Sequence, residues 1–275
     1  MNPFLKRLVT DIPLMGEETL GYILNLALTK DDVQLAEHPA VKRMRADMAP
    51  KVELRGDIAI VPVQGTLAYN PDPLEMLFDG VEDSRSVLSM IQWAADNPDV
   101  KGILIRMDTP GGMLLGGPEM ADAVTSARRT KPVVTHIGGL GASLGYMIAS
   151  QSTEIVGNRS SISGSVGVIA SVVDYSGLLA RIGISFEYFT NKEATFKGVG
   201  AVGNKLTDAQ RENIQQSVDS AFTMFKDMVR SRRPNVKDDA MRGQTFRGSE
   251  AKAAGLIDRI GDEQYAISVL KSYIE

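Results

Sequence analysis

Between residues 58 and 157, apolar runs of strand length alternate with amphipathic segments of helical length. Several of the apolar runs show no in–out alternation, which is typical of strands covered on both faces of a sheet. Strands separated by helices imply parallel pairing through βαβ crossovers. The pattern predicts strands over 58–63, 100–107, 131–137 and 154–156, and helices over 86–95, 118–129 and 144–150.

The C-terminal part of the chain is predicted to be mostly helical. Thr207 is a suitable cap for a long helix over 208–230, whose apolar residues share one face. Shorter helices are expected over 250–254 and 263–274. An apolar run over 166–173 and a strand over 185–190 precede these helices.

The first 50 residues have a different pattern. They are polar and helix-prone, and Leu20, Ile23, Leu24, Ala27 and Leu28 recur at helical spacing. Scattered charges and Pro50 are typical of a linker. We therefore expect a helical N-terminal arm over 1–50 and a main α/β domain over 51–275, with a parallel β-sheet and a helical C-terminal part.

Composition and charge restrict the function. The 275 residues carry a net charge of −4, which argues against nucleic acid as a partner. No cysteine is present, which excludes thiol catalysis, disulfides and zinc–thiolate sites. Asp11, Glu17 and Glu18 interrupt the first apolar positions, so we expect neither a signal peptide nor a membrane span. A cytoplasmic protein is the resulting expectation.

The segment Gly141-Ala-Ser143-Leu-Gly145 follows a predicted strand and precedes a predicted helix. This G-x-S-x-G spacing is that of a nucleophile elbow, a sharp turn that exposes a serine oxygen at a helix start. The free amides of the helix would then lie beside the serine. An alternative is that the small residues mark close packing between helix and strand.

A serine nucleophile needs a base, and the sequence offers little histidine. His38 and His136 both precede Ser143, whereas an α/β-hydrolase places its histidine after the nucleophile. A lysine is therefore the natural candidate, and we expect His136 to be a packed side chain. Dinucleotide binding is disfavoured because Gly139-x-Gly141-x-x-x-Gly145 misses the G-x-G-x-x-G spacing by one residue.

The segment Asp108-Thr-Pro-Gly-Gly112 closes the predicted strand that precedes the elbow strand. Ligands usually bind at the carboxyl edge of a parallel sheet, and exposed glycine amides can hold an oxyanion. We expect the amides of Gly111 or Gly112, together with Leu144, to form that oxyanion hole. The alternative is a tight turn that needs glycine for its geometry. Asp108 is expected to be structural.

Three motifs together resemble a known family. Asp108-Thr-Pro-Gly-Gly112, Ala142-Ser143-x-Gly145-Tyr146 and Ser163-Gly-Ser-Val-Gly-Val168 occur in that order in signal peptide peptidase A and the phage head-maturation proteases. A closing Gly248-Ser-Glu-Ala-x-x-Ala-Gly-Leu-Ile-Asp258 is also similar. The resemblance covers about 57–261 and implies a Ser–Lys peptidase with a ClpP/crotonase-like fold.

The resemblance also implies the roles of two further residues. Of Lys192, Lys197 and Lys205, Lys197 best matches the distance of the family lysine from the following helix cap, so it is the expected base. Ser165 would orient the lysine amine. A free lysine has a pKa of about 10.4, so a lysine base needs apolar surroundings that disfavour its charge. No cofactor and no metal are expected.

The expected function is that of a serine endopeptidase that hydrolyses peptide bonds through an acyl-enzyme. The motif residues and the helical arm favour the phage members, which cut scaffold or portal proteins inside a prohead, and the family implies a ring of identical chains. One alternative is a cytoplasmic signal-peptide-peptidase-like protease. Others are a crotonase-type acyl-CoA enzyme using Glu119, which CoA binding would reveal, and a non-catalytic assembly protein, which would bind without cleaving.

Overall fold

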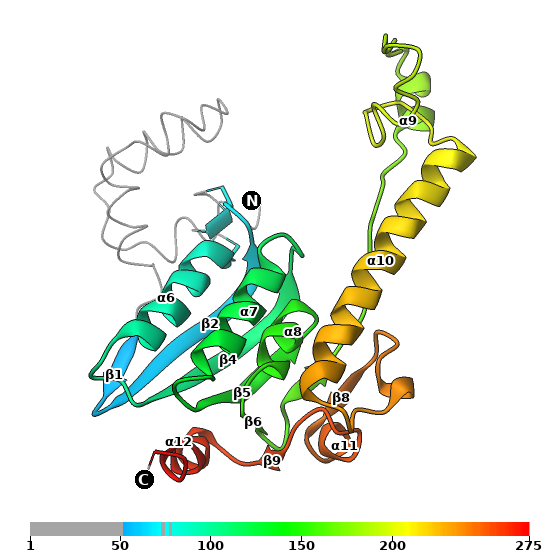
Figure 1. Ribbon diagram of the computed structural model, residues 1–275. Coiled ribbons are helices and arrows are strands. Elements are labelled where there is room, and N and C mark those ends of the chain that lie inside the picture. Colours follow the sequence, from blue (N-terminus) through cyan, green and yellow to red (C-terminus); the bar gives the residue numbers. More distant parts are fainter. Residues whose placement is uncertain (1–51, 73–74, 77–78, 275) are drawn as a thin grey trace, which may run out of the picture.

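The computed structural model describes residues 52–72, 75–76 and 79–274. The predicted N-terminal arm over 1–50, and its boundary with the main domain, lie outside these residues. The described residues form a mixed α/β fold around one sheet (Figure 1).

Nine strands of the described residues form this sheet. The central order is β1-β2-β4-β5-β6-β9, with β3 beside β2 and β7 between β5 and β8. Pairing is parallel except for β1 with β2 and β7 with β8. The strands are β1 (Glu53–Arg55), β2 (Ile58–Ala68), β3 (Val81–Asp83), β4 (Gly102–Gly112), β5 (Val133–Ala142), β6 (Glu154–Gly157), β7 (Ile162–Gly164), β8 (Thr245–Arg247) and β9 (Arg259–Ile260).

Helices cover both faces of the sheet (Figure 1). Residues of β2 alternate between the two cores, because Ala59 and Val61 pack with the helices α6, α7 and α8 whereas Ile58 and Ile60 pack with α12. This explains the uninterrupted apolar runs in the sequence. The helices are α6 (Ser84–Asp96), α7 (Gly117–Ala127), α8 (Leu144–Ser150), α9 (Ser176–Arg181), α10 (Asp208–Arg232), α11 (Gly248–Ala253) and α12 (Glu263–Lys271), with a 3₁₀ turn η1 (Asp238–Ala240).

The predicted α/β class, the parallel sheet and the helical C-terminal part are confirmed. The helix α8 has the predicted bounds, and the cap of α10 is a full capping box between Thr207 and Gln210. The strands β2 and β4 extend to Ala68 and Gly112, several residues beyond the predicted ends. The sequence pattern does not predict short strands such as β3 and β7, because they hold few residues and depend on their neighbours for pairing.

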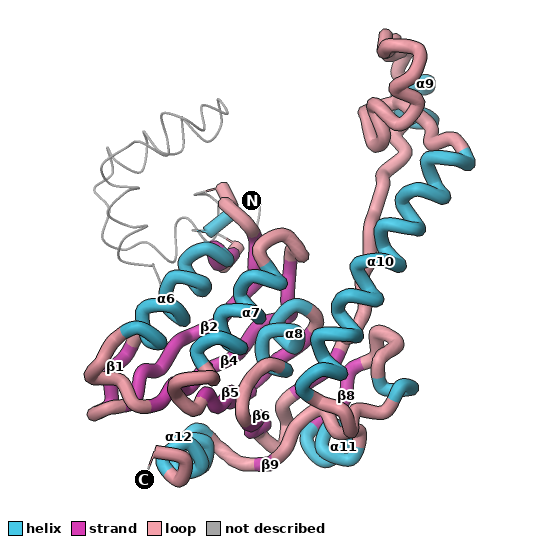
Figure 2. The backbone as a smooth tube through the Cα atoms, viewed as in Figure 1, coloured by secondary structure: helices cyan, strands magenta, loops and turns pink. Residues whose placement is uncertain are grey.

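The strand predicted over 185–190 is wrong, because these residues form no ladder. They belong to the projecting arm, by which we mean residues 169–207. Figure 2 shows the arm as mostly loop, reaching away from the sheet beyond the start of α10. The apolar run over 166–173 also leaves the core, since Val166 is buried whereas Ile169 is 87% exposed. Among the described residues, no neighbouring strand lies beside the arm to pair with its backbone.

One carboxyl group is buried where β3 meets β2. Glu82 is 7% exposed, and its Oε2 accepts a hydrogen bond from the Gln64 backbone N–H at 2.7 Å. Its other oxygen has no hydrogen-bond partner among the described residues. Burial raises the pKa of Glu82 to about 7, with a further increase from the nearby Asp83 charge. The folded protein therefore holds this proton at pH values where the unfolded chain has lost it.

Glu82→Gln should change how stability depends on pH. The raised pKa makes the folded state bind more protons than the unfolded state between about pH 4.5 and 7, so the wild type loses stability as pH rises through this window. The variant keeps an acceptor for Gln64 but does not titrate. Its free energy of unfolding relative to wild type should rise by about 3 kcal/mol from mildly acidic to mildly alkaline pH. Urea unfolding at both pH values measures this difference.

The exposed Glu119 provides the control, because Glu119→Gln makes the same change in net charge without removing a buried carboxyl. A constant difference between Glu82→Gln and wild type across the pH range would contradict the assignment.

Candidate active site

Ser143 lies at the junction of β5 and α8, directly before the first helical residue. Its backbone has φ 52° and ψ −123°, a conformation that a residue with a side chain rarely adopts. The Ser143 N–H donates to the carbonyl of Gly164 at 2.9 Å, and its own carbonyl accepts from Met147 N–H at 3.0 Å. These bonds join the elbow to β7 and α8, and they hold the strained turn that the G-x-S-x-G spacing predicts.

The end of β4 lies against this elbow. A Cβ atom added at Gly111 would be 2.7 Å from Ser143 Cβ and 2.8 Å from the backbone nitrogen of Leu144. The Gly111 backbone, with φ 99°, therefore approaches the serine and the first helical amide so closely that only a residue without a side chain fits. The predicted glycine segment and the predicted nucleophile meet in space.

Thr109 holds the glycine segment in place. Its hydroxyl donates to the carbonyl of Gly65 at 2.5 Å and accepts from the Gly111 N–H at 3.0 Å. The amide of Gly111 is thus already paired in this structure. The helix start leaves the Leu144 N–H without an intrahelical acceptor, as at any helix N-terminus. The oxyanion hole formed by Gly111 or Gly112 with Leu144 stays a prediction.

Asp108 and His136 have the structural surroundings expected of them. The Asp108 carboxylate accepts a hydrogen bond from the Leu140 backbone N–H at 2.9 Å, which ties β4 to the end of β5. His136 is buried, and its Nε2 lies 3.2 Å from Oδ1 of Asn158. His136 also lies about 20 Å from the elbow along an extended strand, too far to serve Ser143 as a base.

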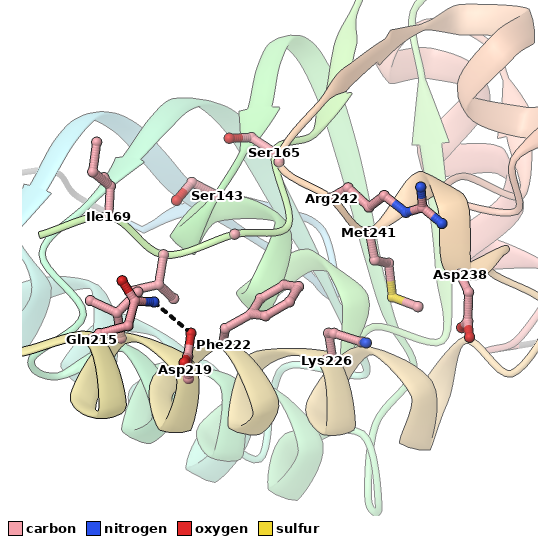
Figure 3. A pocket seen from close by; sticks show the side chains of 14 residues that line it. Ser143, Ser165, Ile169, Gln215, Asp219, Phe222, Lys226, Asp238, Met241 and Arg242 are labelled. Atoms are coloured by element: carbon pink, nitrogen blue, oxygen red, sulfur yellow. Dashed lines mark hydrogen bonds between the residues drawn. The ribbon is translucent and has the colours of Figure 1, made fainter. Parts of the chain in front are cut away.

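Ser143 and Ser165 line one pocket, as Figure 3 shows. Ser165 also has a positive φ, 52°, and its N–H donates to the carbonyl of Gln244 at 2.7 Å. The pocket has a volume of about 810 Å³ and is bounded by α10 and by the loop that precedes β8. Its lining residues are Ser143, Ser165, Gly167, Val168, Ile169, Gln215, Val218, Asp219, Phe222, Lys226, Asp238, Met241, Arg242 and Gly243.

Lys197 does not line this pocket. It is exposed in the projecting arm, where the neighbouring Thr195 carbonyl accepts a hydrogen bond from Gln210 at the start of α10. The α10 residues that line the pocket run from Gln215 to Lys226, about 8 to 24 Å further along the helix axis at 1.5 Å per residue. Within one protomer, the structure brings together Ser143, Ser165 and the glycine segment but leaves Lys197 apart.

Sequence reasoning misses two contributors to the site. Thr109 is visible in the sequence only as part of the glycine motif, and its role depends on the contact of its hydroxyl with Gly65. The apolar residues of α10 are predicted only to share one face of the helix. Phe225 is buried in the core and Phe222 packs against it, and Val218 and Phe222 also form a wall of the pocket. Glu119, the carboxylate of the acyl-CoA alternative, lines a different groove between α6 and α7.

In the ranges that the structure describes, no group of three or more His, Asp or Glu side chains could hold a metal ion. None of the helices described here combines the length and the apolar character needed to cross a bilayer.

Sequence comparison finds relatives named as proteases. The chain is 29% identical over 193 residues to the putative protease MJ0651 of Methanocaldococcus jannaschii, covering 69% of the chain and 61% of that protein. It is 28% identical over 229 residues to capsid assembly protease C of Escherichia phage lambda, an alignment that covers 82% of the chain and 52% of that protein. It is 29% identical over 191 residues to a putative signal peptide peptidase SppA of Enterococcus faecium, an alignment that covers 68% of the chain and 55% of that protein. The chain thus spans little more than half the length of these relatives.

A solved structure of an enoyl-CoA hydratase/isomerase family member aligns with 82% of this chain and 76% of its own. Its TM-score of 0.44 and identity of 15% are too low to indicate function.

The strain at Ser143 should be measurable as a difference in the free energy of unfolding between two variants. Glycine adopts positive φ without penalty, so Ser143→Gly relieves strain that Ser143→Ala retains. We expect Ser143→Gly to be about 1 kcal/mol more stable than Ser143→Ala, after the entropic cost of glycine is deducted. Chemical denaturation of both variants measures the difference.

Ser150 provides the matched control in the same helix, where the backbone is helical. There the order should reverse, with Ser150→Gly less stable than Ser150→Ala because glycine is a poor helix former. The same order at both positions would show that Ser143 carries no strain.

The family profile of peptidase family S49 matches residues 125–275, slightly more than half of the chain. This range includes the elbow at Ser143, the second hydroxyl at Ser165 and the projecting arm with Lys197. Together with the strained serine and the adjoining glycine segment, this match shows that the chain belongs to peptidase family S49.

Proposed function

We propose that this protein is a serine endopeptidase in which Ser143 is the nucleophile and Lys197 of a neighbouring protomer is the base. The observation that carries the proposal is the strained turn at Ser143, which holds the serine at a helix start beside the Gly111 backbone. Such strain is retained where function requires it. Membership of a peptidase family supports the chemistry.

A neighbouring protomer as the source of the lysine is supported by the projecting arm. Lys197 does not line the Ser143 pocket of its own chain, and the arm around it exposes large apolar side chains, with Phe189 at 91%. Apolar surface of this extent favours contact with another protein. Docking of the arm on a second copy would cover these side chains and bury the lysine, and burial disfavours the charged ammonium.

The proposed reaction is acyl transfer. The neutral lysine amine takes the proton of the Ser143 hydroxyl as its oxygen attacks the peptide carbonyl. Backbone amides at Gly112 and Leu144 would stabilise the oxyanion. The Gly111 amide would contribute if it gave up its hydrogen bond to the Thr109 hydroxyl and donated to the oxyanion instead. The lysine then protonates the leaving amine, and water hydrolyses the acyl-enzyme. Ser165, which lines the same pocket, would orient the lysine amine.

The biological setting is proposed from the relatives. Similarity to a capsid assembly protease of phage lambda supports head maturation, with scaffold or portal proteins as substrates in a prohead or host cytoplasm. Similarity to a putative signal peptide peptidase supports the alternative, a protease that degrades peptides.

Mixing two inactive variants tests the shared site. Ser143→Ala and Lys197→Ala should each fail to cleave a pool of unstructured peptides, measured by mass spectrometry. Once the subunits exchange, a mixture should regain activity at about a quarter of its sites, because intact serine and intact lysine then meet across an interface. Sites made within one chain would gain nothing from mixing.

Lys192→Ala is the matched control, since Lys192 is an exposed lysine of the same arm. It should cleave as wild type does. If the Lys197→Ala variant retained activity without mixing, another lysine, such as Lys226 in the pocket, would have to be the base. Equal cleavage by Ser143→Ala and wild type would remove Ser143 from the mechanism.

A further inference from the structure

The pocket beside Ser143 is apolar along its walls and charged at both ends. Phe222 and Met241 lie in the middle, with Lys226 beyond Phe222 from the two serines and Arg242 beside Met241, on the side of Asp238 (Figure 3). A substrate side chain that entered beside Ser143 would first pass apolar surface and then reach two cations.

The carboxylates of the pocket are already engaged. Asp238 accepts a hydrogen bond from Arg230 at 2.6 Å, and this bond is the main reason that the pKa of Asp238 is lowered. Asp219 accepts from the side-chain amide of Gln215 at 2.8 Å, near the opposite end of the pocket (Figure 3). Neither carboxylate makes a hydrogen bond or a close ion pair with Lys226 or Arg242.

The two cations therefore remain available. Lys226 is half-buried, and its ammonium lies over the Phe222 ring, 5.2 Å from the ring centroid. The Arg242 backbone donates to Gln244, but its guanidinium makes no hydrogen bond or ion pair within the described ranges. Their interaction with Asp238 is electrostatic only. A carboxylate at this end would gain charge-assisted hydrogen bonds from both groups.

We propose that this pocket selects a substrate residue with a carboxylate side chain next to the cleaved bond, and that Lys226 and Arg242 determine this specificity. The expected preference in cleavage rests on the proposed function, whereas the expected preference in binding does not. Glutamate should fit better than aspartate, because Lys226 lies beyond Phe222 and a longer methylene chain can contact this apolar wall.

The test measures binding separately from cleavage. Short amidated alanine peptides with a single glutamate, glutamine or lysine, scanned through each position, are titrated against the Ser143→Ala protein by fluorescence anisotropy. The best glutamate peptide should bind about tenfold or more tightly than its glutamine counterpart, and the ratio should fall as salt is raised. In wild type, the same peptide should be cleaved next to its glutamate.

Substitutions assign the effect to residues. Lys226→Gln and Arg242→Gln, each combined with Ser143→Ala, should each reduce the glutamate-to-glutamine ratio severalfold, whereas Lys226→Arg should retain it. Lys226→Glu should reverse the preference toward the lysine peptide. Lys237→Gln is the matched control, because Lys237 is an exposed cation beside Asp238 that does not line the pocket.

The outcomes separate the two proposals. A glutamate preference that depends on Lys226 or Arg242, without any cleavage by wild type, would support the specificity pocket and contradict the peptidase. Cleavage by wild type with equal binding of glutamate and glutamine peptides would support the peptidase and overturn the pocket. A glutamate preference unchanged in both Lys226→Gln and Arg242→Gln would also overturn the assignment.

Discussion

The contact between the Gly111 backbone and the turn at Ser143 is the constraint on which the site depends. No side chain fits between them, since a Cβ at Gly111 would meet Ser143 Cβ, the Ala142 carbonyl and the Leu144 nitrogen within 2.8 Å. The contact requires β4 and β5 to end side by side, and a parallel sheet places those ends at the same edge. Gly145 makes a second contact that leaves no room for a side chain, because a Cβ there would meet the Thr109 methyl group at 2.5 Å.

The strained residues of the site are held by hydrogen bonds from outside their own strands. Ser143 is bonded to Gly164, and Ser165 to Gln244, so the two positive-φ serines are tied to each other through β7 and the loop before β8. Thr109 joins the glycine segment to Gly65 of β2. Because each bond crosses between elements, the turn conformations are a property of the assembled sheet rather than of the local sequence.

The projecting arm has surroundings unlike those of the rest of the chain. The sheet buries its apolar residues on both faces, whereas the arm exposes side chains such as Ile169 and Phe189. A segment with this composition gains free energy when another surface covers it. The same arm carries Lys197, so burial of the arm and completion of a Ser–Lys pair would be one event. This links the proposed assembly to the proposed chemistry.

The sequence by itself determined the α/β class, the order of most strands and helices, and the elbow at Ser143, because period and turn chemistry are local. The order of the motifs along the chain also indicated the family. The same patterns did not predict the short strand β7 or the loss of a strand over 185–190, since a strand forms only where a neighbour offers a ladder. Only the tertiary structure decided that Thr109 binds Gly65, that Phe222 lines the pocket, and that Lys197 lies away from the Ser143 of its own chain. These are contacts between residues far apart in the chain, and they depend on how the sheet and α10 are placed in space.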